Sequence, residues 1–101
     1  MAHKVVFRPA AAADLRQIYL SVSEYAGYGR AGGYLDRIEA ACMSLETFPE
    51  RGTVRDRLLP GLRIIGFERS ASIAFRVSGD TVEILRVFRR GQDIPTDWMD
   101  A

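Results

Sequence analysis

The stretch Thr81-Val-Glu-Ile-Leu-Arg-Val-Phe-Arg89 decides the fold of this chain. It is rich in β-branched and aromatic residues, which favour strands. On a regular strand one face would hold Val82, Ile84, Arg86 and Phe88, and the other would hold Leu85 and Val87. Because both faces carry apolar side chains, the pattern predicts a strand inside a sheet. An arginine on such an apolar face needs a partner.

Two more apolar runs come before this strand, at about Leu62 to Phe67 and Ser72 to Val77. The turn Ser78-Gly-Asp80 joins the second run to the last strand, and glycine makes such a hairpin easy. Because these connections are short, we expect antiparallel pairing. Residues 50–61 are polar and rich in turn formers, which predicts a loop.

The N-terminal half predicts one strand followed by two helices. The run His3–Arg8 is β-like and ends at Pro9, because proline cannot donate to a sheet ladder. Apolar residues at helical spacing then form two stripes: Leu15, Ile18, Tyr19 and Val22, followed by Tyr34, Ile38, Ala41, Leu45 and Phe48. Between the stripes we expect a break at four glycines, Gly27, Gly29, Gly32 and Gly33. Pro49 should end the second helix.

The predicted order is β-α-α-β-β-β, an α+β fold with a helical hairpin packed on one face of an antiparallel sheet. At 101 residues, the chain is expected to form a single domain over residues 1–101, with 94–101 as a short tail. No apolar run approaches the roughly 18 residues that span a bilayer, and no signal region opens the chain. With Cys42 as its only cysteine, it is expected to be a cytoplasmic protein without a disulfide or a membrane partner.

The residues that usually carry catalysis are scarce. The only histidine is His3, near the terminus, and the carboxylates show no metal-ligand spacing, so we expect no metal, no cofactor and no histidine-based mechanism. Charge is nearly balanced, with 14 basic and 13 acidic residues, which argues against broad attraction to nucleic acid.

Arginine side chains are the remaining candidates for functional chemistry, since every basic residue except Lys4 is an arginine. Clustered arginines can hold a phosphate without a metal, but many are instead paired with carboxylates such as Glu68, Glu83 or Asp93. Arg63 and Arg86 lie inside apolar strands, so pairing or function must account for them. The tyrosines are more typical of core packing with a polar tip, whereas Trp98, in a polar tail, suits a partner anchor.

Taken in order, several segments resemble the ParE branch of the RelE/ParE toxins. They are Pro9-Ala-Ala-Ala-Ala-Asp14-Leu15, the Ala31 to Tyr34 stretch, Phe48-Pro49-x-x-Gly52, Gly61-Leu62-Arg63, Ile73-Ala-Phe-Arg-Val77 and Val82-Glu-Ile-Leu-Arg-Val-Phe88. The resemblance covers about residues 5–93. It implies the same β-α-α-β-β-β order, and a toxin of a type II toxin–antitoxin module whose antitoxin folds its C-terminal part onto the toxin.

The resemblance also bears on the target. RelE-like members cleave messenger RNA on the ribosome with basic residues and commonly a C-terminal tyrosine, whereas ParE-like members poison DNA gyrase. This chain has no tyrosine after Tyr34 and no lysine after Lys4, which favours the gyrase interpretation and a protein that acts by binding. Where ParE-like chains often carry a His-Gly pair after the last strand, this chain has Arg89-Arg90-Gly91-Gln92-Asp93. A ribosome-dependent ribonuclease, with Arg63 and Arg86 on the phosphate, and a non-toxic antitoxin-binding module remain as alternatives.

The resemblance and the pattern together predict two surfaces and no catalytic residues. For the target, DNA gyrase, the candidates are Arg63, Arg86, Arg89, Arg90, Asp93 and Trp98. For a ParD-like antitoxin, in a hetero-oligomer, the helical hairpin and exposed strand edges should offer an apolar groove, with Tyr19, Val22, Tyr25 and Tyr34 as candidates. Direct sequence-specific binding to nucleic acid is not expected.

Overall fold

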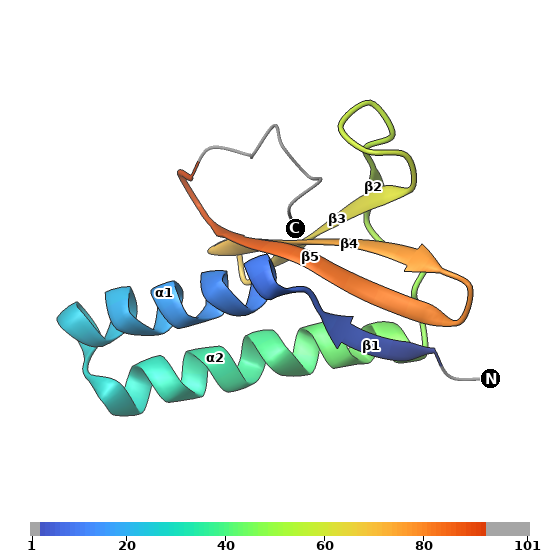
Figure 1. The fold of residues 1–101 in the computed structure, drawn as a ribbon. Coiled ribbons are helices and arrows are strands. Elements are labelled where there is room, and N and C mark those ends of the chain that lie inside the picture. Colours follow the sequence, from blue (N-terminus) through green and yellow to red (C-terminus); the bar gives the residue numbers. More distant parts are fainter. Residues whose placement is uncertain (1–2, 93–101) are drawn as a thin grey trace.

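The computed structural model describes residues 3–92, which form two layers, a helical hairpin and a five-stranded sheet (Figure 1). The hairpin covers one face of the sheet, so the predicted α+β architecture is confirmed. The elements in chain order are β1 (Lys4–Phe7), α1 (Pro9–Ala26), α2 (Tyr28–Met43), a 3-10 turn (Ser44–Glu46), β2 (Thr53–Val54), β3 (Leu62–Phe67), β4 (Ala71–Ser78) and β5 (Thr81–Arg89).

The sheet is mixed rather than antiparallel throughout. Its strand order is β1-β5-β4-β3-β2, and β1 runs parallel to β5, with Phe7 opposite Ile84. The other pairs are antiparallel, as their short connections predict. Nearly the whole chain separates β1 from β5, so no tight turn imposes a direction on that pair. The short edge strand β2 lies within the segment that was predicted to be loop.

Of the four glycines predicted to break the helices, only Gly27 does so, with a φ of 87°. Gly29, Gly32 and Gly33 lie inside α2, so their prediction as a loop was wrong. Each costs a helix about 1 kcal/mol relative to alanine. Burial of α2 against α1 and the sheet outweighs this cost. The second helix also ends earlier than Pro49, at Met43.

A β-bulge in β5 changes which side chains reach each face. Ala74 pairs with Arg86, but the next residue of β4, Phe75, pairs with Ile84, so Leu85 is an extra residue. An extra residue reverses the facing of every side chain beyond it. The predicted faces were therefore wrong past the bulge: Val82, Ile84 and Val87 belong to the helix-facing core, and Leu85 and Phe88 to the opposite face.

The main core lies between the hairpin and the sheet, and a smaller apolar cluster lies on the other face. Phe75 and Ile38 are among the largest fully buried side chains. Cys42 is buried in the main core, and burial raises the pKa of its thiol to about 12, so it stays protonated and unreactive at neutral pH. Within residues 3–92, neither helix is long and apolar enough to cross a membrane.

Candidate functional site

Asp14 joins the first half of α1 to β5. Its carboxylate accepts hydrogen bonds from Arg86 Nε at 2.7 Å and Nη2 at 2.9 Å, and from the backbone N–H of Val87 at 2.9 Å. That N–H lies just past Ile84, where the pairing of β5 with β1 stops. The hydrogen bonds to Asp14 raise the pKa of the Arg86 guanidinium, although burial opposes the shift. The partner expected for Arg86 is therefore Asp14, and we call this three-bonded contact the Asp14 clamp.

The structure does not gather the predicted target residues into one site. Arg86 is already hydrogen-bonded to Asp14 in the clamp. Arg63 is half-buried on β3, on the same face as its cross-strand neighbour Phe75. Arg89 donates to Ser21 and Tyr25 on α1, and Arg90 is exposed just after β5. Asp93 and Trp98 lie outside the described residues.

The arginines predicted to be paired with Glu68 and Glu83 have such partners. Arg37 donates to both carboxylate oxygens of Glu68, at 2.8 and 3.2 Å. Arg76 lies 3.3 Å from Glu83. These pairs are exposed or half-buried, so they hold local geometry and leave those arginines less available to an external anion.

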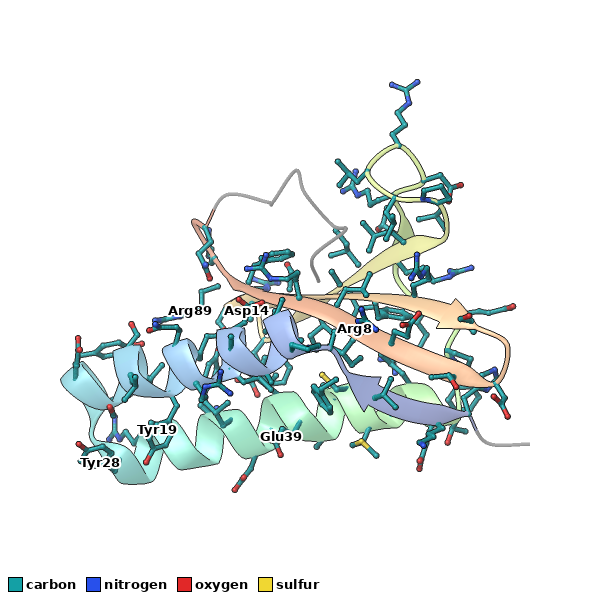
Figure 2. All side chains as sticks on the ribbon, viewed as in Figure 1. Arg8, Asp14, Tyr19, Tyr28, Glu39 and Arg89 are labelled. Carbon is teal, nitrogen blue, oxygen red and sulfur yellow. The ribbon has the colours of Figure 1, made fainter. Side chains whose placement is uncertain are left out.

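An apolar groove runs between α1 and α2 on the solvent side of the hairpin, and we call it the hairpin groove. Leu20 stands 53% exposed at its edge, and Leu35 lies within it. The exposed ring of Tyr28 stacks on Tyr19, with the centroids 6.0 Å apart. Figure 2 shows Tyr19 and Tyr28 together near the turn of the hairpin, with Glu39 farther along α2. The groove is lined by Leu15, Arg16, Tyr19, Leu20, Gly32, Leu35, Asp36 and Glu39.

The residues predicted for the antitoxin divide between this groove and other places. Tyr19 lines the groove. Tyr25 is exposed but binds Arg89, outside the groove. Val22 is buried in the core, and Tyr34 is half-buried with its hydroxyl 2.6 Å from Ser70 Oγ. The apolar stripe of each helix includes its core-facing side, so stripe membership also selected Val22, which a partner does not reach.

Sequence reasoning missed Leu20 and Tyr28. The sequence signal that could have identified them is their position outside the core-facing apolar stripe. A leucine or tyrosine on the polar side of an amphipathic helix has no core to pack against. Such residues, when they gather with others, mark an interaction surface.

The structure also places the residues that were considered for metal binding and general-base catalysis. Residues 3–92 contain no group of three or more His, Cys, Asp or Glu side chains that could hold a metal ion. His3 sits at the start of β1, and its Nδ1 is buried without a hydrogen-bond partner. No carboxylate or hydroxyl in this part of the chain hydrogen-bonds to that nitrogen.

Comparison with known proteins shows the family of this chain. The family model for the ParE toxin of the type II toxin–antitoxin system parDE matches residues 5–94. Toxin ParE3 of Caulobacter vibrioides is 35% identical over 74 residues, which is 73% of each chain. A chain of the chromosomal ParDE toxin–antitoxin system of P. aeruginosa superimposes with a TM-score of 0.77 at 30% identity, covering 87% of this chain and 96% of that one.

A more distant structure shares the fold alone. A chain of the toxin–antitoxin complex RelBE2 of Mycobacterium tuberculosis superimposes with a TM-score of 0.64 at 20% identity, over 89% of this chain and 100% of that chain. The family match and the ParE3 relative both extend over most of the sequence, and the two-layer fold agrees with them. The chain is therefore a member of the ParE family, a toxin of a type II toxin–antitoxin system.

Proposed function

We propose that this toxin inhibits DNA gyrase in the cytoplasm and is neutralised by a ParD-like antitoxin. The observation that carries the choice of target is the Asp14 clamp. A ribonuclease of the RelE type would need Arg86 on the scissile phosphate, but its guanidinium is held in a bidentate pair with Asp14. The sequence also has no tyrosine after Tyr34 and no lysine after Lys4 to move a proton there. Action by binding fits these residues better than RNA cleavage.

Purified toxin is expected to block supercoiling by gyrase and to trap cleaved DNA, and added antitoxin should reverse both effects. Primer extension on messenger RNA from expressing cells should show no new 5′ ends. Growth arrest with unaffected gyrase would disprove this target, and new 5′ ends would favour the ribonuclease. Normal growth on expression without antitoxin would favour a non-toxic binding module.

The hairpin groove is the surface that we propose for the antitoxin. Its lining is largely apolar and includes the exposed Leu20, and the exposed ring of Tyr28 stacks on Tyr19 of the lining. Asp36 and Glu39 line the α2 side, so a basic residue on the partner would find a counter-charge there. An amphipathic segment with apolar residues on one face and a basic flank suits this combination. The C-terminal part of a ParD-like antitoxin is the occupant to which we commit.

Leu20→Glu is expected to weaken antitoxin binding at least about tenfold, equivalent to about 1.4 kcal/mol, because it places a charge against the largely apolar lining. Isothermal titration calorimetry measures the affinity. Leu58→Glu makes the same change at another exposed leucine, on the β2–β3 loop, which Figure 1 shows projecting away from the hairpin. The control should bind like the wild type. Equal affinity of the Leu20 variant and the wild type would remove the groove from the antitoxin interface.

A further inference from the structure

A second pocket, of about 210 Å3, opens at the end of the molecule where the hairpin turn approaches the β3–β4 turn and the end of β5. We call it the basic pocket. It shares no lining residue with the hairpin groove. The side chains around it are Val22, Tyr25, Arg30, Tyr34, Arg37, Ser70 and Arg89.

The lining carries more positive than negative charge. It includes three arginines and no carboxylate. Arg37 is neutralised by Glu68, which lies outside the lining. Arg89 contacts hydroxyl groups and an aromatic ring, none of which carries a charge. Arg30 is exposed and makes no hydrogen bond or ion pair with any of residues 3–92. Two guanidinium charges therefore remain without a counter-charge at one pocket.

Arg89 is held in place for binding. Its Nη1 donates to Ser21 Oγ at 3.1 Å and its Nη2 to Tyr25 Oη at 2.8 Å, and the guanidinium lies over the Tyr25 ring. A guanidinium has five N–H donors, so these two bonds leave donors for an external acceptor. Because the hydroxyl groups that orient the Arg89 guanidinium are neutral, they do not offset its positive charge. An arginine that is already ordered loses less entropy when it binds a ligand.

We propose that the basic pocket binds a phosphate group of the DNA backbone. Arginine, serine and tyrosine are among the side chains that proteins use on DNA phosphates, and the guanidinium fork matches phosphate geometry. The pocket is open at its edge, where Tyr25 is 68% exposed, so a phosphate can enter while it remains part of a strand. The contact carries no sequence information. The proposal of this site rests on the proposed action on gyrase, which brings the toxin to DNA held by that enzyme.

The test uses fluorescence anisotropy of a short labelled DNA duplex with the purified toxin at low salt and without gyrase. Arg30→Gln and Arg89→Gln are each expected to weaken binding about three- to tenfold, and to lower the slope of log K against log salt by about 1. Arg57→Gln, which removes the same charge from the β2–β3 loop, should change affinity less than about twofold. Arg30→Lys should retain most of the binding, because it keeps the charge.

Three results would overturn the proposal: no binding to the duplex, even if inorganic phosphate binds; an equal loss from the Arg57 control; or displacement of DNA by a polyglutamate peptide as readily as by pyrophosphate. Arg30 makes no hydrogen bond, ion pair or ring contact with any of residues 3–92, so its variants remain informative if Arg89→Gln lowers the melting temperature. If the toxin inhibits gyrase but DNA binding does not depend on the pocket, this proposal is wrong and the gyrase target is retained. If DNA binding depends on the pocket but gyrase is not inhibited, the gyrase target is wrong and the phosphate site is retained.

Discussion

Replacing Asp14 with alanine is expected to lower the free energy of unfolding by about 3 kcal/mol, the low end for removing one member of a buried ion pair, because this pair is only partly buried. The Arg86 side chain is only 24% exposed and would lose its counter-charge. The backbone N–H of Val87 would lose its acceptor as well. On that side of β5 no strand is paired to take over, because β1 has already ended at Phe7, whereas β4 pairs with Val87 on the other side. The loss therefore combines an uncompensated charge with an unmade hydrogen bond.

Urea denaturation followed by circular dichroism measures this loss. The double variant Asp14→Leu/Arg86→Met should lose less than Asp14→Ala alone, because it removes both charges and fills their space with apolar groups. Glu68→Ala breaks another bidentate arginine pair, with Arg37, whose members are 56% and 43% exposed, and it should leave the urea midpoint close to that of the wild type. Equal destabilisation by Asp14→Ala and Glu68→Ala would show that burial of the Asp14 clamp contributes nothing.

Gly52→Ala is expected to cost about 3 kcal/mol, from about 1 kcal/mol for the left-handed backbone and about 2 kcal/mol for a steric clash. The φ of Gly52 is 85°. A Cβ atom there would collide with the carbonyl oxygen of Ile64 and lie 2.5 Å from Ile65 Cγ2. The oxygen belongs to strand β3 and cannot move without disturbing the sheet. The change should therefore destabilise the segment that leads into β2.

Gly79→Ala separates the two contributions. Gly79 also has a positive φ, of 61°, but an added Cβ would meet no atom within 4 Å. It should cost about 1 kcal/mol, from backbone conformation alone. Differential scanning calorimetry of both variants checks the difference of about 2 kcal/mol that the clash predicts. If the two variants melt together, the close approach of Gly52 to β3 is relaxed in solution.

The two proposed surfaces show which site residues the local sequence pattern predicted and which it did not. The pattern predicted a hairpin surface for the antitoxin, and Tyr19 does line a groove there. It also selected Val22, because a helical stripe identifies an apolar side without saying whether that side faces the core or a partner. Leu20 is informative for the opposite reason, since its place off the stripe leaves it exposed. For the target, the pattern identified Arg86 as needing a partner, but it did not identify Asp14.

Periodicity along the chain was sufficient to predict that both helices, β3 and β5 exist, because each element has its own repeat and its own turn residues. The helical glycines, the bulge at Leu85 and the parallel pairing of β1 with β5 depended on packing between elements. The same holds for the Asp14 clamp, whose two charged residues are 72 positions apart. The basic pocket likewise joins residues of both helices, a turn and the last strand. Residues far apart in the sequence come close only when the hairpin docks on the sheet. The tertiary structure therefore decided which charges lie near each arginine, and hence the role of that arginine.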